Sequence, residues 1–290
     1  MTLRAALVRA VSRAVSSAAA AGILARCLEW GLRRVGPRRA VGLLNLERAY
    51  PETDGNWRRN IIDCVYRSIA LTTAEYLCLV NHPDSISDWV TEIDGEEHLR
   101  NLRDSGLGGV ILSGHYGNWE LLGAWLSIKG YMSGVVVRNP DAEDLADLIE
   151  SFRTSVGVRT FEKTVSLKTL LGIVKHGGRV GIMPDQAWSS VHGVSSEFYG
   201  RPCFTAPGAA AIAVLAGVPV VPVVAVRTAP FRHRIVASPP FTAEPGSDRD
   251  ERIRRTVLRI DRTLEEIVRH RPDQWLWLHR RWPRATGDIA

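Results

Sequence analysis

The chain has 290 residues, of which 45% are hydrophobic, and its mean hydropathy of −0.05 is close to zero. Such a chain is expected to form one soluble α/β domain with a full-sized core. Its formal charge is +6, carried almost wholly by arginine, which suits phosphorylated lipids, an anionic bilayer, nucleic acid or an acidic carrier protein. The four cysteines form no CxxC pair, so the sequence indicates neither a disulfide framework nor a zinc knuckle, and a reducing, cytosol-facing compartment fits best.

Residues 1–39 are expected to form a membrane-associating helix that precedes a single α/β domain over 40–290. The alanine-rich run at 15–31 is interrupted by Arg26 and Glu29 before it reaches the ~20 apolar residues that a bilayer span needs. With arginines on both sides, it is typical of an amphipathic helix that lies on an anionic surface. A signal peptide and a soluble helix packed on the domain remain the alternatives.

Residues 40–80 predict two helices, broken at Pro51, the second running from about 57 to 80. From residue 108, short β-branched runs alternate with helical stretches. Strands are expected at 108–114, 133–138, 158–161 and 179–184, and helices through 121–125 and over 141–155 and 166–176. This alternation predicts a mostly parallel central sheet flanked by helices.

Beyond a loop at 187–197, the pattern predicts a helix at 207–216, strands at 217–227 and 232–238, and a long helix at 248–270. Two prolines in the first of these strands favour edge or irregular pairing. The chain closes with the tryptophan- and arginine-rich segment QWLWLHRRWPR.

Three polar side chains each follow a predicted strand: His115, Arg138 and Asp185. Because ligands of open parallel sheets collect at the carboxyl ends of the strands, we expect these three residues to converge on one edge. That edge is the candidate site.

His115 stands five residues before Glu120, so the two side chains cannot meet on one continuous helix. If Gly117 makes a turn and Asn118 caps the following helix, Glu120 falls in its first turn and can reach back to the imidazole. A carboxylate that fixes the tautomer leaves the other ring nitrogen basic. No G-x-S-x-G motif is present, so the substrate itself would be the nucleophile.

Five segments resemble one family. RAVGLLNLERAYPE, SGHYGNWEL with its H-x4-E spacing, VVVRNPDAEDL, the block from MPDQ through EFYGRPCFTAPG, and DQWLWLHRRWPR are similar to the motifs of the late acyltransferases of lipid A biosynthesis. These enzymes belong to the lysophospholipid acyltransferase-like group, which implies a glycerol-phosphate-acyltransferase-like α/β fold. The resemblance covers most of the chain, and it is more specific for the superfamily than for the acceptor lipid.

The resemblance implies transfer of a lauroyl- or myristoyl-type acyl group from a thioester, on acyl carrier protein or CoA, to a hydroxyl of a glycolipid, a lipid A precursor above all. His115 would be the general base and Glu120 its orienter. Arg138, Asp185, Asn118 and Glu197 would bind substrate or stabilise the oxyanion. Another envelope acceptor, such as a phosphatidylinositol mannoside, ornithine lipid or aryl polyene lipid, is the alternative. The enzyme is expected at the cytoplasmic face of the inner membrane.

The terminal HRRW segment has two interpretations: a membrane-interface patch, or buried tryptophans with Arg280 and Arg281 near acceptor phosphates. We expect mainly the second. A non-catalytic peripheral lipid-binding protein is the rival outside the enzyme class. We expect no cofactor and no metal, because the histidines lack partners at ligand spacing, and no nucleic-acid partner, because no recognition motif is present.

Overall fold

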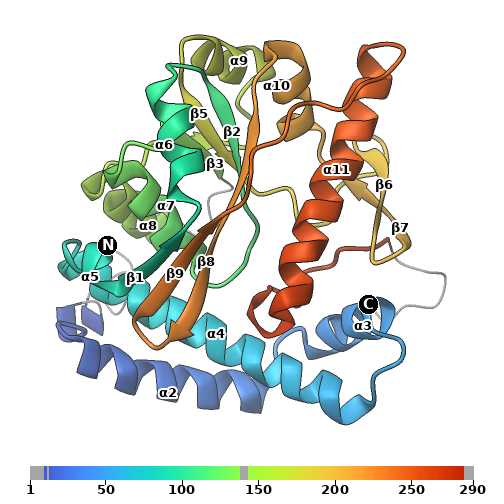
Figure 1. Ribbon diagram of the computed structural model, residues 1–290. Coiled ribbons are helices and arrows are strands. Elements are labelled where there is room, and N and C mark those ends of the chain that lie inside the picture. Colours follow the sequence, from blue (N-terminus) through green and yellow to red (C-terminus); the bar gives the residue numbers. More distant parts are fainter. Residues whose placement is uncertain (1–9, 12, 138–142, 284–290) are drawn as a thin grey trace.

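The computed structural model describes residues 10–11, 13–137 and 143–283, which form a central sheet flanked by helices (Figure 1). The sheet has seven strands in the order β1-β9-β8-β2-β5-β3-β4, and all neighbouring pairs are parallel except β8 with β9. The predicted fold class is confirmed. The strands are Val90–Asp94 (β1), Gly109–Leu112 (β2), Gly134–Val137 (β3), Thr160–Glu162 (β4), Arg179–Ile182 (β5), Val220–Ala229 (β8) and Arg232–Ala237 (β9).

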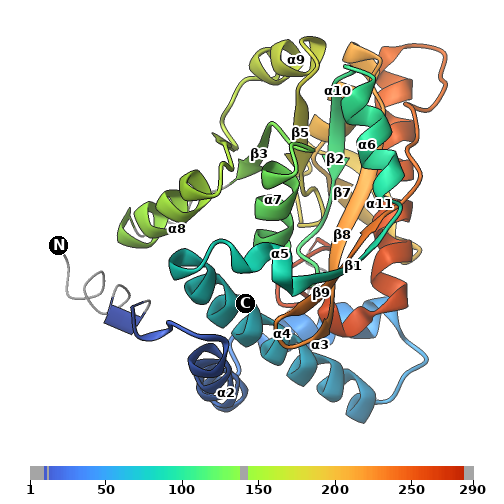
Figure 2. The ribbon, with the colours of Figure 1, turned by 60° about the vertical axis from the view of Figure 1, so that its left-hand side comes forward.

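Helices cover both faces of the sheet, as a parallel sheet requires, and Figure 2 shows the layers from the side. One core cluster lies under α3, α9, α10 and α11, and the other under α2 and α5 to α8, with α4 contributing to both. The helices are Ala18–Val35 (α2), Arg39–Ala49 (α3), Gly55–Asn81 (α4), Ser85–Trp89 (α5), Glu96–Asp104 (α6), Trp119–Ile128 (α7), Glu143–Ser155 (α8), Leu167–Lys175 (α9), Gly208–Ala216 (α10) and Arg249–His270 (α11).

Strand β8 lies in the interior of the sheet, so the edge position, one of the two expectations, is wrong. The other, irregular pairing, is met where β8 pairs with β9, because the register shifts between Arg227 and Ala229. Pro222 sits opposite Leu112 in the parallel pairing with β2. Its carbonyl still accepts a hydrogen bond from Ser238, so the missing N–H removes one donor without ending the ladder. Pro222 is therefore tolerated inside this strand, because the backbone hydrogen bond at this position uses its carbonyl oxygen and not an N–H.

Three strands, as well as helices α5 and α6, have no counterpart in the sequence expectations. Strand β1, between α5 and α6, pairs with β9 at the edge of the main sheet. Val194–Phe198 (β6) and Arg201–Thr205 (β7) form a separate antiparallel hairpin. The charged or mixed composition of these short strands, such as VTEID in β1, carries no clear twofold alternation of apolar side chains.

The long helix α4 crosses the end of the sheet at which β2 and β8 terminate, and α2 lies alongside it (Figures 1 and 2). Helix α2 turns its small residues Ala21 and Ala25 inward, which lets the two helices approach closely. Ser17 caps its N-terminus and Gly36 its C-terminus. Across the described part of the chain, no helix combines the length and the apolar character needed to cross a bilayer.

Candidate active site

The candidate site lies where two neighbouring strands end. Strands β2 and β5 are paired in register, with Leu112 opposite Ile182. His115 and Asp185 each follow three residues later on their own chain segments, so the parallel pairing brings them together. Gly114 allows the close approach, because a Cβ at that position would lie 3.2 Å from Oδ2 of Asp185.

Asp185 holds His115 by two hydrogen bonds. The imidazole Nδ1 lies 2.9 Å from Oδ1, and the backbone N–H of His115 donates to Oδ2 at 2.8 Å. The indole N–H of Trp275 also donates to Oδ2, at 2.8 Å. Since an ionised carboxylate only accepts, Nδ1 carries the proton and Nε2 is left as the basic nitrogen.

Burial and charge act in opposite directions on this pair. Burial opposes protonation of His115, but the negative charge and hydrogen bond of Asp185 outweigh it and raise the histidine pKa, with a smaller contribution from Glu120. Burial alone would raise the pKa of Asp185, yet His115 and the Trp275 N–H lower it to about 2. The aspartate is therefore ionised throughout the physiological range.

The exposed side of the imidazole is bordered by three side chains. The side chain of His115 is 20% exposed, whereas that of Asp185 is 2% exposed. The Trp119 ring lies edge-on at 5.4 Å, the His279 ring stacks at 6.4 Å, and Nε2 of Gln186 lies 3.2 Å from Nε2 of His115. A substrate hydroxyl that replaced Gln186 at this nitrogen would stand in position to give up its proton.

Glu120 does not hold the imidazole, contrary to the sequence expectation. It does fall in the first turn of α7, but its carboxylate forms a bidentate pair with Arg153 of α8, at 2.7 and 3.2 Å. The carboxylate that is hydrogen-bonded to the imidazole is that of Asp185. Glu120 acts on His115 only through its charge.

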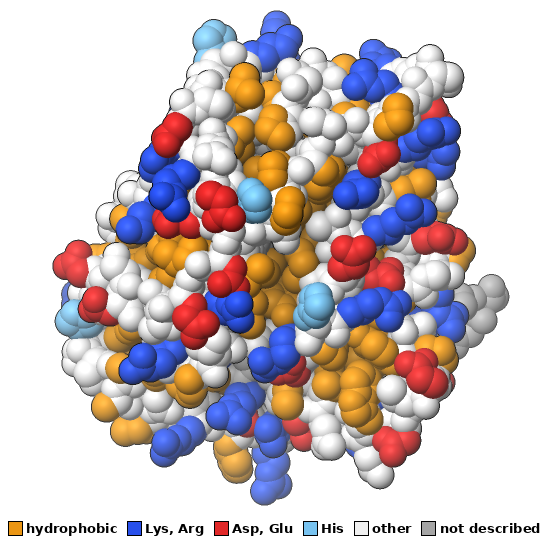
Figure 3. Space-filling view, viewed as in Figure 1, with side chains coloured by type: hydrophobic (Ala, Val, Ile, Leu, Met, Phe, Trp, Pro, Cys, Tyr) orange, Lys and Arg blue, Asp and Glu red, His pale blue; other side chains and the backbone are white. Residues whose placement is uncertain are grey.

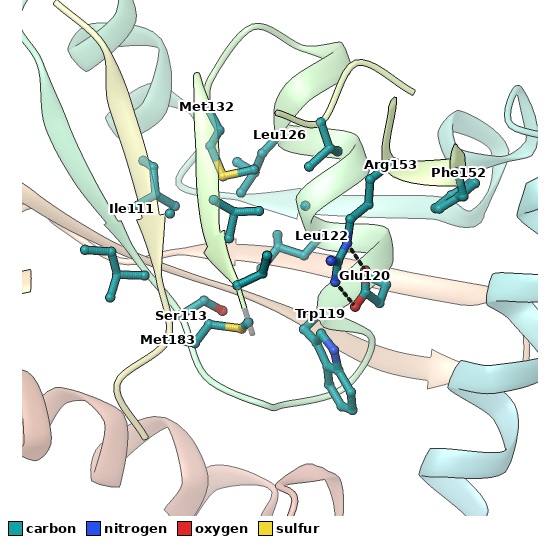
Figure 4. A pocket seen from close by; sticks show the side chains of 16 residues that line it. Ile111, Ser113, Trp119, Glu120, Leu122, Leu126, Met132, Phe152, Arg153 and Met183 are labelled. Carbon is teal, nitrogen blue, oxygen red and sulfur yellow. Dashed lines mark hydrogen bonds and ion pairs between the residues drawn. The ribbon is translucent and has the colours of Figure 1, made fainter. Parts of the chain in front are cut away.

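An apolar pocket of about 540 Å³, counting its open part, lies between the sheet and helices α7 and α8. It is lined by Trp119, whose ring contacts that of His115. Trp119, Glu120 and Arg153 stand at one end, and Leu126 and Met132 lie at the other (Figure 4). Apart from these two charged residues and Ser113, the lining residues are hydrophobic or glycine. A pocket of this kind fits a hydrocarbon chain better than a polar ligand.

The turn between His115 and α7 agrees with the sequence in its shape. Gly117 has a φ of +57°, and a Cβ there would lie 1.8 Å from the carbonyl oxygen of Ala225, so only glycine fits. Asn118 caps α7 by accepting from the N–H of Leu121. Asn118 is fully buried, however, so the expectation that it contacts substrate does not hold.

The terminal segment is hydrogen-bonded to both site loops, the one that contains His115 and the one that contains Asp185. The N–H of Leu276 donates to the His115 carbonyl, Gly117 donates to the Gln274 carbonyl, and Ala187 donates to the Arg280 carbonyl. The tryptophans of this segment are buried, which confirms their structural interpretation and contradicts a membrane-interface patch: Trp275, Trp277 and Trp282 are 3%, 0% and 4% exposed.

Arg281 is not available to an acceptor phosphate, contrary to expectation. It is 1% exposed and bonds Asp261 at 2.7 Å and Thr205 at 2.8 Å. A buried guanidinium paired in this way ties the terminal segment to α11 and β7. Arg280 is partly exposed beside the Asp185 loop, and Glu197 lies exposed on β6, outside the main sheet. Arg138 falls outside the described residues.

The sequence did not predict the part that three residues take at the site: Arg153, Trp275 and Glu75. Arg153 lies in a helix of ordinary composition and belongs to no motif. Trp275 donates a hydrogen bond to Asp185, which is 90 residues away in the chain. The third, Glu75 of α4, is fully buried behind the turn that follows His115. Asp185 can be identified as the partner of His115 only if β2 and β5 are known to be neighbours in the sheet. One sequence does not show the order of the strands.

An open α/β sheet that presents a carboxylate-held histidine near an apolar pocket has the parts that an enzyme acting on an apolar substrate needs. The chain belongs to the bacterial lipid A biosynthesis acyltransferase family, whose model matches residues 6–284. It is therefore an acyltransferase, and its similarity to relatives extends over nearly all of its length.

Two relatives come from Escherichia coli (strain K12). The lipid A biosynthesis lauroyltransferase is 24% identical over 261 residues, 89% of this chain and 83% of the relative. The lipid A biosynthesis palmitoleoyltransferase is 21% identical over 257 residues, covering 87% and 81%. A phosphatidylinositol mannoside acyltransferase of Mycobacterium tuberculosis (strain ATCC 25618 / H37Rv) is 25% identical over 147 residues, covering 49% and 46%. The family and these relatives indicate an envelope glycolipid as acceptor.

Among solved structures, the 1-acyl-sn-glycerophosphate acyltransferase PlsC from Thermotoga maritima matches 84% of this chain and 96% of its own, with 15% identity and a TM-score of 0.37. A similarity of this size carries no argument about the site, which is built from the chain's own residues.

Proposed function

We propose that this enzyme moves a fatty acyl group from an acyl thioester, on acyl carrier protein or CoA, to a hydroxyl of a lipid A precursor. The observation that carries this proposal is the His115–Asp185 pair beside an apolar pocket, with no hydrogen-bonded protein nucleophile on the histidine among the described residues. The lipid A acceptor is supported by the two Escherichia coli relatives, which match most of the chain.

In this mechanism, Nε2 of His115 takes the proton of the acceptor hydroxyl as its oxygen attacks the thioester carbonyl. The C–O bond forms, the carbonyl electrons move onto oxygen, and on collapse the C–S bond breaks and the imidazolium returns the proton to the leaving thiolate. Asp185 keeps the ring in the required tautomer and stabilises its charged form. We assign stabilisation of the oxyanion to the guanidinium of Arg153, which lines this end of the pocket. Arg138 keeps the oxyanion role that the sequence suggests for it.

The pocket between the sheet and helices α7 and α8 would hold the acyl chain, and its depth would set the chain length. Gly123 of α7 lines it, and a Cβ there would meet nothing within 4 Å. A side chain at this position therefore projects into open pocket space without backbone strain. Gly123→Leu would fill part of that space with four carbons.

The test is the mass of the lipid formed from a series of acyl thioesters and each candidate acceptor, a lipid A precursor and a phosphatidylinositol mannoside. We expect the natural enzyme to acylate the lipid A precursor. Gly123→Leu should shift the preferred chain to one shorter by about two to four carbons, because each methylene that no longer fits loses about 0.8 kcal/mol of burial.

The matched control is Gly172→Leu on α9, whose Cβ also meets nothing within 4 Å but which does not line the pocket. It should keep the chain preference of the natural enzyme. If only the phosphatidylinositol mannoside is acylated, the lipid A precursor is not the acceptor. If no acyl product forms with either acceptor, the proposed function is wrong. If Gly123→Leu keeps the chain preference of the natural enzyme, the acyl chain does not bind in this pocket.

We further propose that α2 rests on an anionic membrane surface, at the cytoplasmic face of the inner membrane where thioester donors are available. Helix α2 exposes Ile23, Trp30 and Val35 to 64%, 65% and 81%, and arginines lie among them. The guanidinium of Arg34 stacks on Trp30. Arginine side chains and apolar ones gather along the lower edge of the molecule, over α2 (Figure 3). This mixture is typical of a helix at the headgroup level.

Vesicle co-sedimentation tests this orientation. The double variant Ile23→Ser with Trp30→Ser should lower binding to phosphatidylglycerol vesicles by at least about tenfold, since each buried apolar side chain contributes more than 1 kcal/mol. Ile128→Ser, at a residue 49% exposed on α7, is the control and should bind as the natural chain does. Equal binding by the double variant would remove α2 from the membrane contact.

A further inference from the structure

A fully buried carboxylate lies behind the turn that follows His115. Glu75, in the middle of α4, is 0% exposed. Its Oε2 accepts from the side-chain amide of Asn118 at 2.8 Å and pairs with Arg227, while Oε1 accepts from the backbone N–H of Phe231 at 2.9 Å. The imidazole Nε2 of His233 lies 3.2 Å from Oε2. Both oxygens of the buried carboxylate are therefore hydrogen-bonded.

The carboxylate stays charged despite its burial. Burial alone would raise the pKa of Glu75, but the Arg227 charge and the His233 contact lower it to about 2. A buried ion pair of this kind is weak evidence for stability, because a well-packed apolar group often does as well. Its use is better sought in what it holds in place.

What this cluster holds is the turn between β2 and α7. Thr72 of α4 donates to the Gly117 carbonyl at 3.2 Å, and Arg227 donates to the Thr72 hydroxyl at 2.7 Å. On the other side, the Gly117 N–H donates to Gln274 at 3.0 Å. The side chain of Asn118 joins the two sides, since it caps α7 with its oxygen and binds Glu75 with its nitrogen.

We propose that Glu75 and Asn118 form a positioning pair that sets the first turn of α7 relative to His115. The proposal rests on the acyl transfer proposed above. It adds two residues that contact neither the acyl donor nor the acceptor lipid. Trp119 and Glu120, the first residues of α7, both line the pocket, and the Trp119 ring also contacts the imidazole. A displacement of that turn therefore misplaces the acyl group relative to the base.

Geometry of this kind acts on turnover more than on substrate affinity, because a shift of about 1 Å costs about 10²-fold when reacting atoms are misaligned. Asn118→Ser tests it directly. A serine oxygen still caps α7, the Glu75 cluster keeps its other partners, and only the bond from Asn118 to Glu75 is lost. We expect kcat to fall by about 10- to 100-fold, with the KM for the thioester changed less than threefold and little change in melting temperature.

A charge exchange across the pair supplies the rescue. N118D alone places two carboxylates in contact and should lower kcat further. E75Q/N118D restores a hydrogen bond between the two side chains in the opposite direction, from the introduced amide to the introduced carboxylate. It also keeps the cap and leaves one carboxylate in the cluster that contains Arg227 and His233. The double variant should recover at least about tenfold in kcat over N118D. The control is Asp248→Ser, the same kind of cap exchange at the exposed start of α11, which should leave kcat unchanged.

The proposal is overturned if Asn118→Ser turns over within twofold of the natural enzyme, or if E75Q/N118D is no faster than N118D. It is also overturned if kcat follows melting temperature across the whole set. Should the natural enzyme transfer no acyl group at all, the proposed function fails, and the pair is then judged by NMR. The indole N–H resonance of Trp119 should move in Asn118→Ser and stay in place in Asp248→Ser; an unmoved resonance in both would overturn the positioning role.

Discussion

Replacing His115 by asparagine is expected to lower the rate of acyl transfer by about 10² to 10⁴-fold, the range that a general base contributes. Asparagine is the informative substitution because its side-chain amide occupies the place of Nδ1. It can still donate to Oδ1 of Asp185, which lies 2.9 Å from Nδ1 in the natural chain, but nothing replaces the basic Nε2. The variant therefore separates the base from the partner of the buried aspartate.

The measurement is release of free thiol from the acyl thioester, combined with the mass of the acylated lipid. His115→Ala provides the comparison. It should be equally slow but less stable, because it leaves Asp185 with only the backbone N–H and the Trp275 indole as donors and buries an unpaired charge. Turnover by His115→Asn within tenfold of the natural enzyme would show that the histidine is not the base.

Much of the fold follows from local patterns. Strand β2 is a short apolar run that is buried throughout, β5 is buried at its two central residues, and β8 is buried over its first six residues. The helices between these strands have the expected period. The position of β8 does not follow, because the prolines that favour an edge are tolerated in an interior strand whose neighbour needs only the Pro222 carbonyl. Sheet order depends on long-range packing, which no local signal carries.

The same limit separates the correct from the incorrect site predictions. Placing His115 and Asp185 at one sheet edge needs only the rule that parallel strands end together. Choosing Glu120 as the orienter rested on proximity in sequence, whereas Asp185, 70 residues away, is closer in space because β5 pairs directly with β2.

The prediction that Arg281 lies near an acceptor phosphate was wrong for a related reason. Arginine near a polar edge is ordinarily a surface residue, and here a carboxylate on α11 takes it into the core.

The choice between Asp185 and Glu120 is decided by the pH dependence of two variants. The base must be neutral to act, so kcat/KM falls as the pH drops through the pKa of His115. Asp185 raises that pKa most strongly, by charge and hydrogen bond, and Glu120 raises it less, by charge alone. Asp185→Asn removes the main stabilisation of the imidazolium and leaves burial dominant, so the acidic limb should move to lower pH.

Asp185→Asn should also lower the maximal rate by about 10²-fold or more, because the ring loses the partner that sets its tautomer. Glu120→Gln keeps the shape of the side chain and should move the acidic limb in the same direction by a smaller amount. The measurement is the full pH profile of kcat/KM for both variants and the natural enzyme. A larger displacement in Glu120→Gln than in Asp185→Asn would return the orienting role to Glu120, since only the carboxylate bonded to the imidazole can dominate its protonation.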